Sequence, residues 1–229
     1  RIVRGVHEAP DGTLWLGLAG GGLNALDPAT GRVRAFRTGS PGGLSTDDVW
    51  NAVVDEAGIV WAATLGGGLN RVDPRSGSVR VFRAAPGEPG ALSSNNLRVL
   101  TLGRGGELWI GTAGGGLCRF DRAAGTAECY RNDPGDPASL SSDVVRALHE
   151  GPTGSLWIGT DRGINLFEPA SGSFRRFLDD PARPETAGIA RVYGLCESPA
   201  GILWAGTPRG LVRLDPGTGD TRRYRAADG

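Results

Sequence analysis

The segment Leu108-Trp109-Ile110-Gly111-Thr112 returns as Leu156-Trp157-Ile158-Gly159-Thr160, and both copies are followed by a glycine-containing bend. The tryptophan inside this segment recurs five times along the 229 residues, at Trp15, Trp61, Trp109, Trp157 and Trp204. Successive tryptophans are 46, 48, 48 and 47 residues apart. A period in this range is typical of repeat proteins in which no unit can bury its apolar faces alone. The chain is therefore five copies of one supersecondary unit.

Each unit is predicted to contain four short strands. In the second copy the runs are Val49–Val54, Ile59–Thr64 and Leu69–Val72, and a fourth run ends at Phe82. In three copies the third and fourth runs are separated by Asp-Pro and a trailing glycine. These residues favour a turn, because Pro fixes φ and Gly accepts a positive φ. An aromatic residue closes every unit: Phe36, Phe82, Tyr130, Phe177 and Tyr224.

These features predict an all-β chain, a β-propeller built from five four-stranded antiparallel blades. We expect residues 1–229 to form a single array, with repeats near 1–46, 47–94, 95–142, 143–189 and 190–229. The five tryptophans should fill the space between neighbouring blades. Two arrangements stay open, a complete small ring and part of a larger propeller. The missing initiator Met and the strand-like start at Ile2-Val3 indicate that the chain was excised from something longer.

The charge balance excludes some classes of partner. Basic and acidic residues number 25 each, so no global field favours nucleic acid or an anionic membrane. No apolar run approaches the roughly 18 residues of a membrane span, and there is no signal-peptide pattern. We therefore expect neither a nucleic-acid partner nor direct membrane contact by this chain.

The three cysteines leave the compartment open. Cys118 and Cys129 flank the turn of one predicted hairpin, so a cross-strand disulfide is one interpretation. Two small buried thiols are the interpretation that we favour. Cys196 stands apart from both.

The repeat also resembles a known family. The strand segments ending at Thr112 and Thr160, together with the linkers Leu44–Val49, Leu92–Leu97 and Leu140–Val145, look like the two-component regulator propeller repeat over essentially the whole chain. This resemblance implies the extracytoplasmic sensor module of a hybrid histidine kinase or related receptor, a periplasmic location and, in many relatives, a response to oligosaccharides. Two departures stand out: Pro184–Ile189 replaces the usual linker, and the family usually forms rings of seven blades.

One repeat position is the candidate ligand site. The long linkers and the glycine-rich bends share one face of an up-and-down blade, and binding residues concentrate on long loops held by a rigid scaffold. Near that face, eleven residues before each tryptophan, lie Arg4, Trp50, Arg98, Arg146 and Tyr193. Arginines beside aromatic rings suit an anionic or oligosaccharide ligand. The alternative is structural, with salt bridges between blades to Asp47, Asp48 or Asp143 and ordinary packing of the two rings.

Other motifs are predicted to carry no chemistry. A second repeat position holds His7, Val53, Thr101, His149 and Cys196, which is too weak a ligand set for a metal. The glycine-rich bends precede no helix that could hold a phosphate. We therefore predict no metal, no cofactor and no catalytic residue.

The function predicted is non-catalytic ligand recognition. The first alternative is an enzyme similar to the propeller lyases that act on streptogramins. The second is an interaction scaffold or an engineered repeat without a natural ligand. The unsettled closure of the ring also leaves room for self-association through blade edges or propeller faces.

Overall fold

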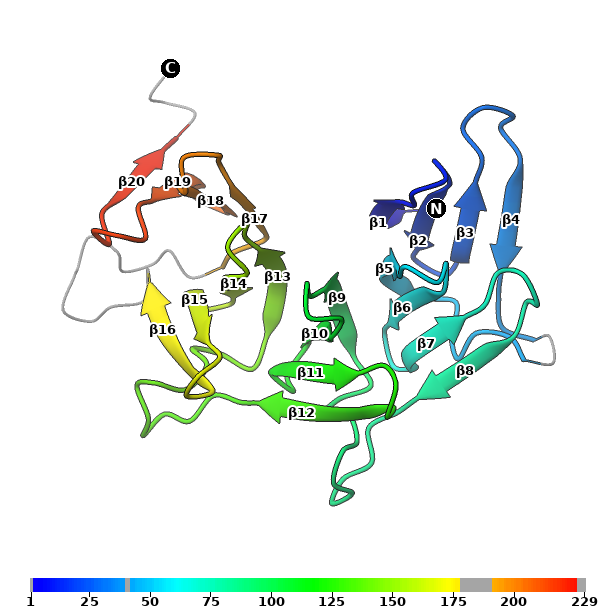
Figure 1. Ribbon diagram of the computed structural model, residues 1–229, viewed down its shortest axis with the longest axis horizontal. Helices are drawn as coiled ribbons and strands as arrows, with labels where there is room; N and C mark the ends of the chain where they lie inside the picture. Colours follow the sequence, from blue (N-terminus) through cyan, green and yellow to red (C-terminus); the bar gives the residue numbers. More distant parts are fainter. Residues whose placement is uncertain (1, 40–41, 178–190, 226–229) are drawn as a thin grey trace. The chain divides into compact units, whose positions relative to one another are not determined.

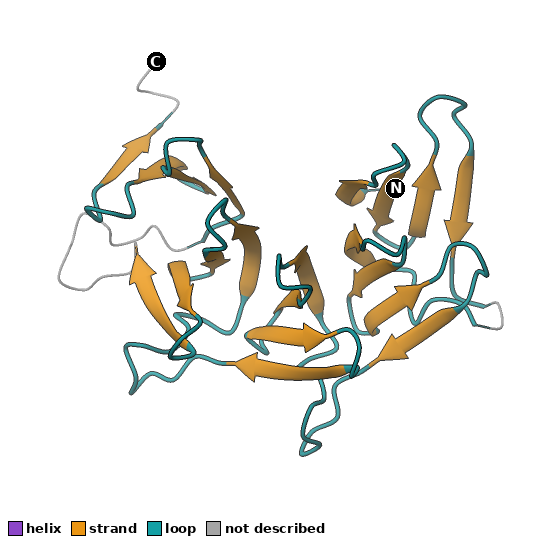
Figure 2. Cartoon of the chain, viewed as in Figure 1, coloured by secondary structure: helices purple, strands orange, loops and turns teal. Residues whose placement is uncertain are grey.

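The computed structural model describes residues 2–39, 42–177 and 191–225. All the regular secondary structure of these residues is β-strand (Figure 2). The chain divides into two compact units, Arg1–Cys129 and Tyr130–Gly229, and each is described by itself. No helix of the described residues is long and apolar enough to cross a membrane. The predicted linker at Pro184–Ile189 lies outside the described residues.

Twenty strands form five four-stranded antiparallel sheets, and strand order within each sheet follows the sequence (Figure 1). This confirms the predicted propeller class. The first unit holds β1 (Val3–Glu8), β2 (Leu14–Leu18), β3 (Gly22–Leu26), β4 (Val33–Phe36), β5 (Val49–Val54), β6 (Val60–Thr64), β7 (Gly68–Val72), β8 (Val79–Phe82), β9 (Leu97–Leu102), β10 (Leu108–Thr112), β11 (Leu117–Asp121) and most of β12 (Thr126–Tyr130). The second holds β13 (Val145–Glu150), β14 (Leu156–Thr160), β15 (Gly163–Glu168), β16 (Ser173–Phe177), β17 (Gly194–Glu197), β18 (Leu203–Thr207), β19 (Gly210–Leu214) and β20 (Thr221–Tyr224).

The strand ends follow the predicted turn chemistry. Asp27 accepts hydrogen bonds from the Ala29 amide at 2.9 Å and from the Thr30 hydroxyl at 2.6 Å, and Gly31 takes a φ of 69°. The Thr30 hydroxyl and the Ala29 amide lower the pKa of Asp27. Each predicted closing aromatic, from Phe36 to Tyr224, is the last residue of the outermost strand of its sheet.

Within each unit the core lies between consecutive sheets. The tryptophan face of one sheet packs against the aliphatic face of the next, as where Trp61 joins Leu100, Leu108 and Phe120 in one cluster. The ring centroids of Trp61 and Phe120 are 5.7 Å apart. Burial confirms the core prediction for four of the five tryptophans, whereas Trp204 is half-buried.

A feature that the sequence analysis missed lies on the outermost strands. In four sheets an arginine two residues before the closing aromatic places its guanidinium over that ring, at 4.7 to 5.0 Å from the centroid: Arg34, Arg80, Arg175 and Arg222. Two of these arginines also donate to a carbonyl in a turn of the following sheet, Arg34 to Pro74 and Arg175 to Pro216. The third sheet has Glu128 at this position.

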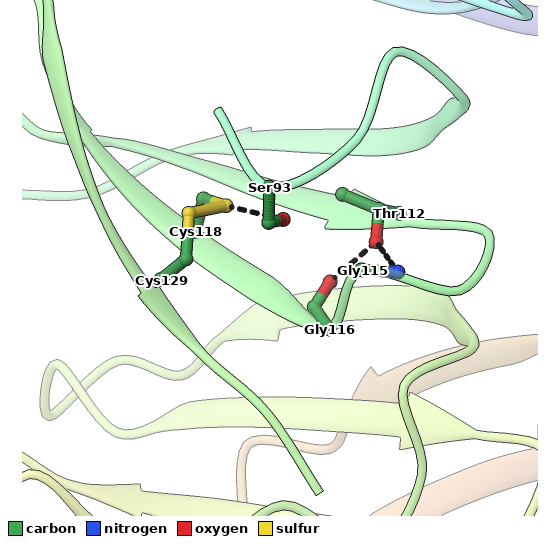
Figure 3. Close-up of a disulfide and its surroundings, with 6 residues drawn as sticks. All are labelled: Ser93, Thr112, Gly115, Gly116, Cys118 and Cys129. Carbon is green, nitrogen blue, oxygen red and sulfur yellow. Dashed lines mark hydrogen bonds between the residues drawn. A yellow bond between two sulfur atoms is a disulfide. The ribbon is translucent and has the colours of Figure 1, made fainter. Parts of the chain in front are cut away.

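The cysteines correct the sequence interpretation. Cys118 of β11 and Cys129 of β12 form a disulfide, with Cα atoms 4.0 Å apart, so the expectation of two buried thiols was wrong (Figure 3). That expectation treated each cysteine as a separate core residue, whereas pairing of adjacent strands brings the two side chains together. Ser93 lies 3.1 Å from the Cys118 sulfur. Cys196 is free and exposed.

Reduction of this disulfide should destabilise the first unit. The bridge closes a short loop with a sequence separation of 11, which in the chain-entropy estimate corresponds to about 2–3 kcal/mol. Urea unfolding followed by fluorescence, with and without reductant, measures the loss, and the Cys118→Ser/Cys129→Ser variant should reproduce it. Equal stability of the oxidised and reduced protein would contradict the expectation.

Candidate functional site

Three of the predicted site residues come together in the first unit. Arg4 of β1, Trp50 of β5 and Arg98 of β9 occupy the same position on the first strands of consecutive sheets, and these strands contact one another. The guanidinium carbon of Arg4 lies 4.0 Å from the centroid of the Trp50 ring, and that of Arg98 lies 5.1 Å from it. Both guanidinium groups thus stack with one indole. We call these three residues the inner cluster.

The backbone at this repeat position is irregular in every one of the first four sheets. The register between the first two strands shifts between Val3 and Gly5, and equivalent shifts flank residues 50, 98 and 146. Arg4, Trp50, Arg98 and Arg146 are therefore each the extra residue of a β-bulge, whereas the described part of the fifth sheet has no such shift. Bulges re-aim a side chain and occur often beside functional sites, at the cost of a disrupted ladder.

The polar groups of the inner cluster are incompletely satisfied. The Nε atom of Arg4 lies 3.7 Å from Oδ1 of Asp48, and both side chains are about a quarter exposed. Within the described residues, neither Asp48 Oδ1 nor Trp50 Nε1 has a hydrogen-bond partner, although both atoms are buried. Buried polar atoms are nearly always paired with protein or water, so a water molecule or a ligand hydroxyl would complete these two.

The two remaining predicted residues meet in the second unit. The guanidinium carbon of Arg146 lies 5.2 Å from the centroid of the Tyr193 ring. Arg146 also forms a salt bridge with Asp161, which the sequence analysis did not anticipate. Arg191 lies 3.8 Å from the same carboxylate. The ring of Tyr193 remains half exposed, so this pair presents an open aromatic face.

The structural alternative for these residues is met in part. Asp48 pairs with Arg4, as that alternative expected. Asp47, however, accepts from the backbone and hydroxyl of Thr38, and Asp143 accepts from the backbone amide of Asn132. Two of the three predicted carboxylate partners therefore cap loops, and neither forms an ion pair with an arginine of the described residues.

The histidine position gathers no set of metal ligands. No group of three or more His, Cys, Asp and Glu side chains that could hold a metal occurs within the described residues. Burial lowers the pKa of His7. His149 Nε2 lies 3.9 Å from Glu197 Oε2, and both atoms are buried.

A cavity of about 860 Å³ lies between the second and third sheets of the first unit, beside their tight turns. Its lining includes Ile59 and Trp61 from the second sheet and Arg122, Ala123 and Thr126 from the third. The sequence favours the opposite side of the sheets, where the long linkers lie, because tight turns by themselves do not indicate a cavity.

Arg122 links the second and third sheets at this cavity through hydrogen bonds. Its Nη1 atom donates to Asp55 at 2.9 Å, and both terminal nitrogens donate to Glu56 at 3.0 Å. The Asp55 carboxylate also accepts from the Trp61 indole at 2.9 Å and from two backbone amides of its own turn. A sequence signal for this role existed, because Arg122 follows Asp121 where the other four copies have proline after Asp or Glu.

Residues 139–162 match the family model described as Two component regulator propeller. This segment is therefore similar to one two component regulator propeller repeat. The repeat spans the linker before β13, the strand itself and β14, so the predicted family resemblance is confirmed on this segment. A search of curated proteins finds no match.

Solved structures share the fold of this repeat array. The extracellular domain of the one component system BT4673 from B. thetaiotaomicron aligns with 98% of the chain at a TM-score of 0.76 and 20% identity, and the chain spans 31% of that domain. The extracellular domain of the hybrid two component system BT3049 from the same organism aligns with 99% of the chain at a TM-score of 0.59, 20% identity and 35% coverage of that domain. Virginiamycin B lyase from Staphylococcus aureus aligns with 97% of the chain at 0.71 and 16% identity, over 69% of its length.

Removal of Arg122 should destabilise the first unit strongly. Arg122→Ala leaves the buried Asp55 carboxylate without its cation, and breaking one partner of a buried pair costs about 3 kcal/mol or more. Arg119→Ala is the matched control, since Arg119 pairs with Glu128 at the surface and should contribute less than about 1 kcal/mol. Urea unfolding of both variants checks the difference, and similar losses would contradict it.

The same network should make stability depend on pH. The Arg122 guanidinium, chiefly through its hydrogen bond, lowers the pKa of Glu56 from 4.5 to about 2. Because the pKa is lower in the folded state, the stabilisation is present above pH 4.5 and is lost as the pH falls toward 2. The stability difference between wild type and Glu56→Gln, from urea unfolding at each pH, should shrink across this window. A constant difference from pH 6 to 2 would count against it.

Proposed function

We propose that this chain is part of a non-catalytic ligand-recognition propeller, the periplasmic input module of a bacterial two-component signalling receptor. The matching repeat at residues 139–162 and the likeness to extracellular domains of signalling systems support this class. The disulfide between Cys118 and Cys129 supports an oxidising compartment such as the periplasm.

The observation that carries the proposal is the recurring bulge at residues 4, 50, 98 and 146. A bulge weakens the ladder, so its repetition at one position is better explained by the side chains that it aims than by stability. The residues at these four positions are three arginines and a tryptophan, not the small or aliphatic residues that form the core.

The inner cluster supplies the chemistry of recognition. Guanidinium groups bind carboxylate, sulfate or hydroxyl oxygens with directed hydrogen bonds, and the Trp50 indole holds both guanidinium groups by cation–π stacking. The buried Trp50 Nε1 donor and the Asp48 carboxylate oxygen offer further hydrogen bonds to a ligand hydroxyl. We expect an anionic or oligosaccharide ligand that displaces Asp48 from Arg4. Signalling then requires tighter binding to one arrangement of the receptor than to another.

An enzyme is the second candidate. The likeness to virginiamycin B lyase and the buried pair of His149 with Glu197 favour it. Turnover of a streptogramin that is lost in His149→Ala would replace the recognition proposal.

Substitution of the arginines tests recognition. A panel of acidic and neutral oligosaccharides would be screened for binding, and bound members titrated by calorimetry against Arg98→Ala and Arg146→Ala. If the ligand binds at the inner cluster, Arg98→Ala should lower its affinity about tenfold or more, and if it binds at the Arg146–Tyr193 pair, Arg146→Ala should do so, because a charge-assisted hydrogen bond is lost. The melting temperature should change little in either variant. The control is Arg83→Ala, because Arg83 is exposed and belongs neither to the inner cluster nor to the Arg146–Tyr193 pair.

Two outcomes would contradict the proposal. A large loss of stability with unchanged binding would make the arginines structural. A stable protein that binds no member of the panel would favour an interaction scaffold.

A further inference from the structure

We infer a second binding site, in the cavity beside the tight turns, for a small organic molecule that carries one anionic group. This site lies away from the inner cluster and does not depend on the proposed function. Its volume of about 860 Å³ is within the range of small-molecule sites.

Two arginines are placed against each other at this cavity. Arg71 of β7 lines it, and Arg80 of β8 is the residue directly opposite Arg71 in the register of the two strands. Like charges directly opposite on neighbouring strands destabilise a sheet. Within the described residues neither guanidinium forms an ion pair: Arg71 has a longer-range attraction to Asp73, and Arg80 lies over the Phe82 ring. An anion between the two would remove the repulsion.

The third sheet shows how the repeat otherwise satisfies this position. There the equivalent residues are Arg119 and Glu128, which form an ion pair at 2.7 Å. The second sheet replaces the glutamate by Arg80 and leaves the charge to be balanced from outside. The Nη2 atom of Arg80 lies 3.7 Å from where a Cβ atom on Gly125 would be, and Gly125 directly precedes the lining residue Thr126.

The other charged groups of the lining set the class of ligand. Asp55 and Arg122 satisfy each other, as do Arg119 and Glu128. The Asp121 carboxylate accepts two backbone amides of its own turn, which lower its pKa, and Glu107 adds a second negative charge. These carboxylates disfavour a polyanion but can accept hydrogen bonds from hydroxyl groups. Ile59 and Trp61 provide an apolar floor. A monoanionic polyol fits this combination.

Gluconate is a suitable probe, and sorbitol is its uncharged counterpart. Each would be titrated at constant ionic strength while the melting temperature and the arginine Nε–H resonances are recorded. We expect gluconate, and not sorbitol, to raise the melting temperature of the wild type saturably and to shift the Arg71 resonance.

Arg80→Glu reproduces the arginine–glutamate pattern of the third sheet. This variant should be more stable than wild type without gluconate and should bind gluconate at least tenfold more weakly. Arg222→Glu is the matched control, because Arg213 and Arg222 are also directly opposed in the fifth sheet and lie outside the cavity lining. It should keep the full response. Arg80→Gln serves if the glutamate variant does not fold.

The inference is overturned if gluconate leaves the wild type unchanged, or if it affects wild type and Arg80→Glu equally. The second result would indicate an adventitious anion effect only. Loss of oligosaccharide binding in Arg98→Ala with the gluconate response intact would separate this site from the inner cluster.

Discussion

The structure depends on one packing constraint within each unit, the burial of the tryptophan face of one sheet against the aliphatic face of the next sheet, as at Trp15, Trp61 and Trp157. Trp61 can be buried only because Leu100, Leu108 and Phe120 are presented by the following copy of the repeat. Close approach of the strands is part of the same constraint. A Cβ atom on Gly5 would lie 2.7 Å from the carbonyl oxygen of Trp50, so only glycine permits β1 to approach β5 this closely.

This packing places equivalent residues of the repeat beside one another. Once the first strands of consecutive sheets are in contact, residues at one repeat position form a row across the sheets. Arg4, Trp50 and Arg98 are neighbours for this reason, although nearly fifty residues separate each from the next in the chain. The rigid core can therefore stay constant while the row changes in chemistry, which is how one scaffold serves different ligands.

The sequence predicts those features that depend on local chemistry. Strand ends and turns such as Asp27 to Gly31 follow from hydrogen bonding and φ preferences within a few residues, and they were found where expected. The bulge at Trp50 could not be predicted in this way, because it is a property of register between two strands and not of either strand alone. The interpretation of Cys118 and Cys129 as separate thiols was wrong for a related reason, since their pairing is decided by the register of the hairpin. Arg122 could have been found by comparing the copies, because it interrupts a proline position.

Arginine serves opposite purposes in this chain, and its surroundings distinguish them. Arg122 donates to two carboxylates and a carbonyl oxygen, and Arg34 donates to the Pro74 carbonyl of the following sheet, so their hydrogen bonds are committed to holding sheets together. Arg71 and Arg80 face each other without such acceptors among the described residues. The chain has 25 acidic residues and 25 arginines, so its net charge of zero does not show which arginines lie beside a carboxylate. Of this opposed pair Arg71 lines the hollow between the second and third sheets, where an external anion would remove the repulsion between the two guanidinium groups.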